Sequence, residues 1–188
     1  MGAKIKIAAI GDSITYGYPF GPAFSWLNSI GNHGRRAVAN RGVCGDTTSG
    51  MLKRFAADVL AVKPHYTFIL GGTNDACSKA AASLVENNIV KMTELAVNEG
   101  IKPVIGIPVP SLSPVEEEIL HTYRLRMYEY ARTAGICYVD FYAAFQAYAA
   151  RNAWQNLYVD ELHPSQTGYR LMGETASGFF GRLTPEVD

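Results

Sequence analysis

Short apolar runs alternate with segments of helical periodicity along this chain of 188 residues, and this alternation constrains the fold more than any other feature. Each run is followed within a few residues by Gly, Pro, Ser or Asn, which commonly end strands. Strands that alternate with helices indicate βα units, whose strands lie parallel in one sheet. We therefore predict an α/β fold with a five-stranded parallel sheet flanked by helices on both faces. The expected strands are residues 5–10, 37–40, 66–70, 104–107 and 137–141.

Four segments carry apolar residues at helical spacing. The third has the clearest ends, because Ser113 and Glu116 form a capping-box sequence around Pro114, and Gly135 follows as a stop. The buried row expected in this helix is Ile119, Tyr123, Met127 and Ala131. The four helical segments are residues 51–60, 80–98, 114–134 and 166–179.

One domain accounts for a chain of this length, because domains typically contain ~150 residues, and we expect residues 1–188 to form it. The 17 Lys and Arg balance the 17 Asp and Glu, which leaves a formal net charge of zero. Proteins that bind phosphate backbones usually carry a basic excess, so nucleic acid is not an expected partner. No window approaches the ~18 consecutive apolar residues of a membrane span. The sequence makes no prediction of the oligomeric state.

The first apolar run is too short for the core of a signal peptide, which indicates a cytoplasmic protein, or a secreted one if a leader was removed. The three cysteines, Cys44, Cys77 and Cys137, cannot all pair, and their spacing matches no zinc motif. We expect three reduced, largely buried thiols. No metal site is expected, because the histidines form no H-x-x-x-H pair and none lies close to a cysteine.

Loops at the carboxyl ends of the strands form the ligand crevice in open α/β sheets, and four such loops carry candidate residues. The first, residues 11–17, reads GDSITYG and lacks the pattern of a phosphate loop. Ser13 at the end of a strand can act as a nucleophile whose own amide N–H points the same way. The alternative is a plain serine cap of a helix.

The second and third loops carry candidate hydrogen-bond donors for an anion. In the second, which reads NRGVCGDTT, Gly45 lets a backbone N–H approach a ligand, although a simple turn glycine is an equal interpretation. Thr47 or Thr48 can cap the helix that follows. In the third, which reads GGTND, the side-chain amide of Asn74 can donate to a developing oxyanion or cap a helix.

The fourth loop, residues 160–165, reads DELHPS. A lone histidine is usually structural, but Asp160 lies three residues before His163 and can accept the proton of one ring nitrogen. The other ring nitrogen is then free to act as a base. Pro164 and a helix cap at Ser165 are expected to stiffen this loop.

These four blocks, in this order, resemble the SGNH hydrolase (GDSL esterase/lipase) family, over nearly the whole chain. The resemblance implies a flavodoxin-like three-layer sandwich and a catalytic triad of Ser13, His163 and Asp160. It also implies an oxyanion hole formed by the N–H groups of Ser13 and Gly45 and by the side chain of Asn74, with no metal. The absence of a G-x-S-x-G motif argues against the α/β-hydrolase nucleophile elbow.

The reaction that the resemblance implies is hydrolysis of carboxylic esters through an acyl-enzyme on Ser13, without a cofactor. Members of the family cleave acetylated sugars, lysophospholipids, aryl esters and thioesters. Because the loops are short for a lid over long acyl chains, we expect small-acyl esters such as acetyl or aryl esters, with acetylated sugars among the candidates. A lysophospholipase or thioesterase and a non-catalytic ligand-binding module are the alternatives. A flavin or nucleotide binder is disfavoured by the missing phosphate loop.

Aromatic residues crowd the segment after Ser13, and residues 108–112 follow the fourth strand as a candidate pocket wall. An aromatic cluster of this kind more often belongs to the core than to an acyl pocket. The five aromatic residues are Tyr16, Tyr18, Phe20, Phe24 and Trp26.

Overall fold

The structure, a computed structural model, describes residues 4–31 and 36–182 and confirms the predicted α/β class. Its five strands are all parallel and follow the order β2-β1-β3-β4-β5, which is the flavodoxin-like order. Each strand ends within two residues of its predicted position. The strands are β1 (Ile5–Gly11), β2 (Arg36–Gly42), β3 (Tyr66–Leu70), β4 (Lys102–Ile107) and β5 (Cys137–Asp140).

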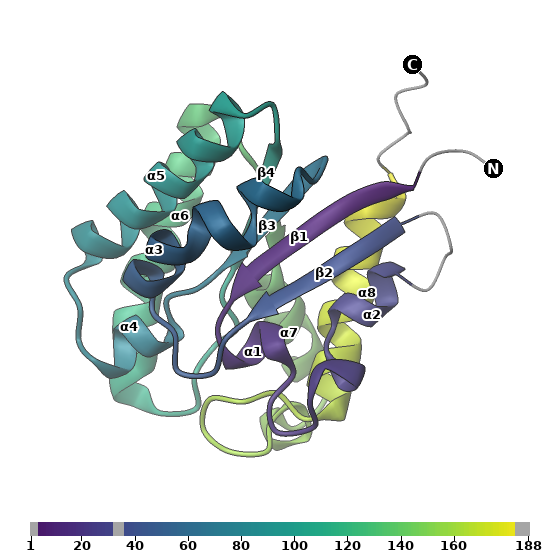
Figure 1. The fold of residues 1–188 in the computed structure, drawn as a ribbon. Coiled ribbons are helices and arrows are strands. Elements are labelled where there is room, and N and C mark those ends of the chain that lie inside the picture. The colour runs from purple at the N-terminus through teal and green to yellow at the C-terminus, as the bar shows by residue number, and fades with distance from the viewer. Residues whose placement is uncertain (1–3, 32–35, 183–188) are drawn as a thin grey trace.

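Helices cover both faces of the sheet and complete the three layers (Figure 1). One face carries α3, α5 and α6, and the other carries α2, α7 and α8, whereas the short helices α1 and α4 follow β1 and β3 directly. The α-helices are α1 (Ser13–Tyr16), α2 (Leu27–Gly31), α3 (Thr48–Asp58), α4 (Thr73–Cys77), α5 (Ala82–Asn98), α6 (Pro114–Ala134), α7 (Phe141–Ala149) and α8 (Gln166–Gly181). Single 3-10 turns span η1 (Pro22–Phe24), η2 (Leu60–Val62) and η3 (Trp154–Leu157).

Apolar residues fill both sides of the sheet, because successive side chains of a strand point to opposite faces. In β1, Ile7 and Ala9 belong to the cluster under α2, α7 and α8, whereas Ala8 and Ile10 belong to the cluster under α3, α5 and α6. All four side chains are buried. A strand covered on both faces needs a continuous apolar run, and the inner strands β1, β3 and β4 carry such runs, whereas the edge strands β2 and β5 are only partly buried.

The aromatic residues after Ser13 divide between core and surface. Trp26 is buried, and its ring centroid lies 4.8 Å from that of Phe68 and 5.2 Å from that of Phe141. Phe20 is half-buried against the same cluster. The exposed members are Tyr16, Tyr18 and Phe24.

Three predictions of local structure are wrong in detail. The last strand does not reach Phe141, because the Asp140 carboxylate accepts a hydrogen bond from the Ala143 N–H at 2.8 Å and begins α7, a helix that the sequence pattern did not predict. Ser113 precedes α6 as expected, but its hydroxyl donates to the carboxylate of Glu116 and makes no bond to the helix backbone. In the buried row of α6, Ile119 is only half-buried, and Leu120 is the buried residue of that turn.

The expectation of buried thiols is wrong, because Cys44, Cys77 and Cys137 are all exposed and unpaired. They lie in the loop after β2, at the end of α4 and at the start of the edge strand β5, where neither helical layer covers them. Among residues 4–31 and 36–182, no group of three or more His, Cys, Asp or Glu residues is placed to hold a metal ion. In the same part of the chain, no helix combines the length and apolar character that a membrane crossing requires.

The topology brings three of the candidate loops to one edge of the sheet. β1 lies between β2 and β3, so the connections after β1 and β3 leave in different directions, the arrangement at which open α/β sheets commonly bind ligands. Gly11 at the end of β1 is in register with Gly42 in β2 and with Leu70 in β3. The three strands therefore end level, and the loops that carry Ser13, Gly45 and Asn74 start side by side (Figure 1).

Candidate active site

Ser13 is held at the first turn of α1, directly after β1. The helix begins there because the carboxylate of Asp12 caps it and accepts a hydrogen bond from the Ile14 N–H at 2.9 Å. Ser13 is nearly buried, and its Oγ lies 3.0 Å from Nε2 of His163, a residue 150 positions away in the sequence. The Ser13 N–H is the first amide of the helix, so it has no acceptor within α1 and is free to point at a ligand.

The structure brings the side chains of His163 and Asp160 together. Nδ1 of His163 lies 2.8 Å from Oδ2 of Asp160, while Oδ1 of Asp160 accepts the backbone N–H groups of Leu162 and His163 at 2.8 and 2.7 Å. Partial burial alone would raise the pKa of the Asp160 carboxyl, but these hydrogen bonds outweigh burial and lower its pKa. The ionised carboxylate therefore fixes the imidazole with Nε2 toward Ser13.

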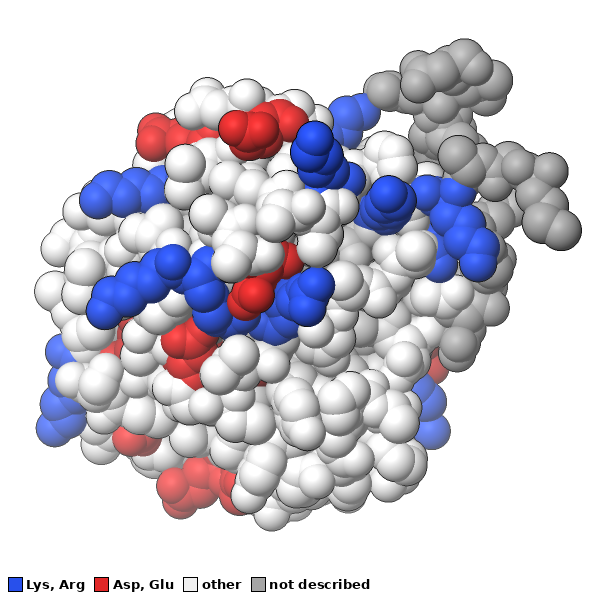
Figure 2. All heavy atoms as spheres, viewed as in Figure 1, with Lys and Arg blue, Asp and Glu red and all other residues white. Residues whose placement is uncertain are grey.

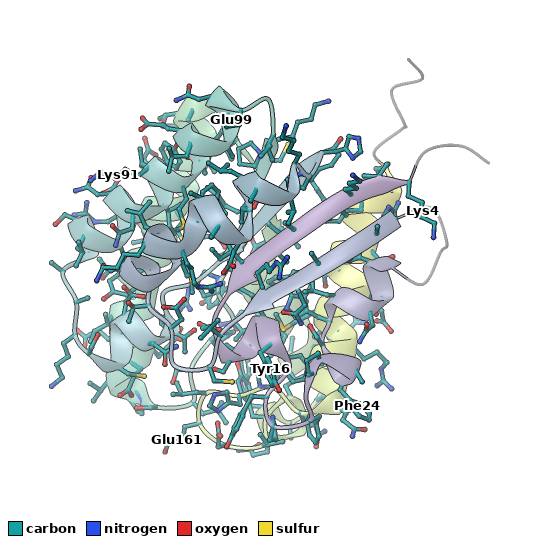
Figure 3. All side chains as sticks on the ribbon, in the orientation of Figure 1. Lys4, Tyr16, Phe24, Lys91, Glu99 and Glu161 are labelled. Carbon is teal, nitrogen blue, oxygen red and sulfur yellow. The ribbon has the colours of Figure 1, made fainter. Side chains whose placement is uncertain are left out.

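The loop after β4 braces the loop that carries His163. The Leu112 N–H donates to the carbonyl of Glu161 at 2.8 Å, and the Ser111 hydroxyl donates to the same oxygen at 3.2 Å. The Val159 N–H donates to the His163 carbonyl at 3.0 Å and closes the loop on itself. Figure 3 shows Glu161 at the same lower edge of the molecule as Tyr16, which ends α1. Residues 108–112, expected as a pocket wall, thus hold the histidine loop in place.

Gly45 and Asn74 lie in the segments that follow β2 and β3. Gly45 has a φ of +79°, a conformation that favours glycine, and its N–H makes no hydrogen bond within the described part of the chain. The side-chain Nδ2 of Asn74 donates to the carbonyl of Asp46, the next residue, at 2.9 Å. Since an amide nitrogen carries two protons, the second N–H of Asn74 is available to a ligand.

Asp75 joins these two loops, and the sequence did not identify this role. Its two carboxylate oxygens accept the backbone N–H of Thr48 at 2.9 Å and the hydroxyl of Thr48 at 2.7 Å. Thr47, one of the two expected caps, accepts a bond from the Gly50 N–H and starts α3. The buried carboxylate of Asp75 therefore fixes the start of α3 against the loop that carries Asn74.

Arg54 is a second supporting residue that the sequence did not identify. Its guanidinium donates to the Asp46 carboxylate at 2.7 Å, to the Arg41 carbonyl at 2.8 Å and to the Gly11 carbonyl at 2.9 Å. It also pairs with Asp58 one turn along α3. The i, i+4 spacing to Asp58 was the only signal in the sequence, whereas the contacts to the ends of β1 and β2 depend on the fold.

Ser13 is hydrogen-bonded to His163, and His163 to Asp160, at the carboxyl edge of a flavodoxin-like sheet. This arrangement defines a class of α/β proteins with a hydrolase-type site. The sequence profile of the GDSL-like lipase/acylhydrolase family matches residues 9–171, a range that includes all five candidate residues. The chain belongs to this family.

Individual relatives agree with this assignment. The chain is 30% identical over 169 residues to the uncharacterized lipoprotein YqeF of Bacillus subtilis (strain 168), covering 82% of this chain and 63% of that protein. A lipolytic protein of the G-D-S-L family from Desulfitobacterium hafniense DCB-2 has a TM-score of 0.82 and 32% identity, over 93% of this chain and 99% of that chain. The lipase/acylhydrolase from Enterococcus faecalis has a TM-score of 0.84 and 28% identity, over 97% and 99%. The chain therefore spans less than two thirds of YqeF and nearly all of the two solved structures.

Asp12 carries the strongest electrostatic perturbation near Ser13. Its side chain is buried, and Oδ2 has no hydrogen-bond partner in the described part of the chain. Burial, reinforced by the negative charges of Asp75 and Asp46, raises the pKa of Asp12 from 3.8 to about 7, although the bond from the Ile14 N–H opposes the shift. The folded protein therefore keeps a proton on Asp12 between pH 4 and 7, where the unfolded chain has lost it. The stability that this proton contributes is lost as the pH rises through 7.

We expect Asp12→Asn to remove this pH dependence, because asparagine keeps the cap acceptor and never ionises. The free energy of unfolding of the variant, relative to the wild type, should rise by roughly 1–4 kcal/mol between pH 4 and 7.5, since each unit of pKa shift corresponds to ~1.4 kcal/mol. Urea unfolding at a series of pH values measures this difference. The exposed Glu99→Gln variant is the control and should parallel the wild type; a parallel curve for Asp12→Asn would contradict the prediction.

Proposed function

We propose that this protein is a serine esterase in which Ser13 is the nucleophile, His163 the general base and acid, and Asp160 the residue that orients the histidine. The observation that carries the proposal is the continuous line of hydrogen bonds from Ser13 Oγ to His163 Nε2, and from His163 Nδ1 to Asp160. A hydroxyl is a poor nucleophile until an adjacent base removes its proton, and this line supplies that base.

In the first half of the reaction, Nε2 of His163 accepts the Ser13 proton while Oγ attacks the ester carbonyl carbon. The carbonyl oxygen gains the negative charge and is stabilised by three donors: the N–H of Ser13, the N–H of Gly45 and the free side-chain N–H of Asn74. The tetrahedral intermediate then collapses, the C–O bond to the alcohol breaks, and the imidazolium of His163 donates its proton to the leaving oxygen. An acyl group remains on Ser13.

In the second half, water replaces the alcohol. His163 accepts a proton from water, the hydroxide attacks the acyl carbon, and the same three donors again stabilise the oxyanion. Collapse releases the carboxylic acid, and the proton returns from His163 to Ser13. The ionised Asp160 keeps the tautomer and stabilises the imidazolium throughout, so the proposed reaction uses only residues of the chain and water.

The proposed substrates are small-acyl esters, such as acetyl or aryl esters, with acetylated sugars among the candidates. Support comes from the short connections around Ser13: one residue separates β1 from α1, two separate β3 from α4 and five separate β2 from α3. These connections provide little material to cover a long acyl chain. Lysophospholipid and thioester hydrolysis are the alternatives within the same chemistry.

We propose that one domain carries this activity and that its ligand is a small molecule. Lys and Arg are interspersed with Asp and Glu on the face shown in Figure 2, which fits the absence of a basic excess in the composition. The cytoplasmic location expected from the sequence stays a prediction, because the curated relative is called a lipoprotein and is longer than this chain.

Treatment with a fluorophosphonate should label Ser13, because in the described part of the chain no other hydroxyl is hydrogen-bonded to a histidine. Peptide mass mapping identifies the labelled residue. Ser13→Ala should abolish both labelling and turnover of p-nitrophenyl acetate, with kcat falling roughly 10⁶-fold while the protein stays folded. Equal ester hydrolysis by the wild type and Ser13→Ala would instead favour a non-catalytic binding module.

Asn74→Ala should lower kcat by ~10²- to 10³-fold with a smaller effect on KM, because its N–H acts mainly on the charge that develops in the transition state. Steady-state kinetics on p-nitrophenyl acetate measures the change, and circular dichroism checks the fold. Asn152→Ala, which removes an exposed amide that bonds only the carbonyl of Tyr148, is the matched control. An unchanged kcat for Asn74→Ala would remove Asn74 from the oxyanion hole.

Acyl-chain preference tests the proposed substrate class. We expect kcat/KM for p-nitrophenyl acetate and butyrate to exceed that for the dodecanoate, because the short loops bury little of a long chain. A series of p-nitrophenyl esters from two to sixteen carbons, assayed below the critical micelle concentration, gives the profile. A maximum at long chains would support the lysophospholipase alternative.

A further inference from the structure

Tyr18 lies directly against the imidazole of His163, although the two residues are far apart in the sequence. Their ring centroids are 4.6 Å apart, and the ring planes are inclined by 55°. Tyr18 is also one of the exposed large side chains, with 43% of its surface accessible. An exposed tyrosine contributes little to the core, so its contact with the histidine requires another explanation.

Backbone hydrogen bonds hold Tyr18 in this position from two sides. Its N–H donates to the Ser13 carbonyl at 3.0 Å, and its carbonyl accepts the hydroxyl of Tyr169 at 2.7 Å. Tyr169 is buried in α8, which packs on the sheet, so this anchor belongs to the rigid part of the molecule. The backbone at Tyr18 is therefore held by Ser13 and by the core.

The turn that carries Tyr18 is also tightly closed. Gly17 has a φ of +103°, and a Cβ at this position would lie 2.5 Å from the carbonyl oxygen of Gly21. The Gly21 N–H donates back to the Gly17 carbonyl at 2.8 Å. Glycine is required here, because the turn needs a left-handed residue in a space that admits no side chain. The chain thus uses a constrained turn to place an exposed aromatic ring.

An aromatic ring in this place can affect the histidine in two ways. It limits rotation of the imidazole, whose two nitrogens must stay in line with Ser13 and Asp160 at the same time. It also lies within the range of about 6 Å over which aromatic rings attract cations, so it can interact with the imidazolium that forms when His163 takes the serine proton. Both effects favour the transition state.

We propose that Tyr18 is a positioning residue that holds the imidazole of His163 in line between Ser13 and Asp160 and stabilises its protonated form during turnover. This inference rests on the proposed function, since it assumes that His163 is the base. It assigns the effect to the aromatic ring and not to the tyrosine hydroxyl, because the contact is between the two rings.

The test compares Tyr18→Leu, which keeps apolar bulk but removes the ring, with Tyr18→Phe, which keeps the ring and removes the hydroxyl. We expect kcat for p-nitrophenyl acetate to fall about 3- to 20-fold in Tyr18→Leu with KM within about 2-fold, from the lost ring interaction and looser orientation. Tyr18→Phe should stay within about 2-fold of the wild type in both constants. Tyr16→Leu, an exposed tyrosine two residues away on α1, is the matched control and should leave both constants unchanged.

A measurement without turnover separates this inference from the proposed function. The His163 ring protons are observed by NMR in the Ser13→Ala protein, alone and combined with each Tyr18 variant. We expect a ring-current shift of these protons and a slowly moving imidazole in Ser13→Ala. Both features should remain with Tyr18→Phe and be lost with Tyr18→Leu. The inference would be overturned if Tyr18→Leu left the imidazole motion unchanged, kept the kcat of the wild type or raised KM alone. It would also be overturned if Tyr18→Phe lost as much kcat as Tyr18→Leu. Failure of the wild type to hydrolyse any ester would overturn the proposed function, and the NMR comparison would still decide whether Tyr18 orders the imidazole.

Discussion

Burial of both faces of the parallel sheet is the constraint on which the rest of the structure depends. Because all five strands run in one direction and helices cover both faces, every loop that follows a strand emerges at the same edge. The position of β1 between β2 and β3 then places the loop with Ser13 between the loops that carry Gly45 and Asn74. The hydrophobic effect has no preferred direction. By packing the sheet it nevertheless brings polar groups that are distant in the sequence to one edge of the molecule.

Hydrogen bonds and ion pairs at this edge of the sheet then fix the loops in defined positions. Asp75 joins the loops after β2 and β3, Arg54 joins the ends of β1 and β2, and the loop after β4 braces the loop of His163. Asp12 has an environment opposite to that of Asp160, because burial without a second partner raises its pKa whereas hydrogen bonds lower that of Asp160. Two carboxyl groups near one serine therefore differ in charge between pH 4 and 7, and Asp160 is the one that contacts the histidine.

The sequence predicted much of this architecture, and its failures have physical causes. The inner strands β1, β3 and β4 are mostly buried and leave continuous apolar runs, whereas the edge strands β2 and β5 are only partly buried, although their positions were also predicted. Helix α7 was missed although Phe141 and Phe145 lie one turn apart on its buried face, because Phe141 was assigned to the end of the last strand. The cysteines were expected inside because a free thiol is usually buried, but they occupy a loop, a helix end and an edge strand. Arg54 could not be identified, because its partners include backbone carbonyls, which have no sequence signature.

The sequence by itself determined the fold class, the family and the residue types at each strand end, because these depend on local pattern and on short motifs. The tertiary structure decided which of those residues meet: Ser13 bonds His163 across 150 positions, Asn74 reaches the residue after Gly45, and Tyr18 packs on the imidazole. Contacts of this kind depend on strand order, register and turn geometry, none of which is encoded in the spacing of residues along the chain. Hydrogen bonds and ring contacts act only over a few ångströms, so they exist only after the packed sheet has brought the loops together.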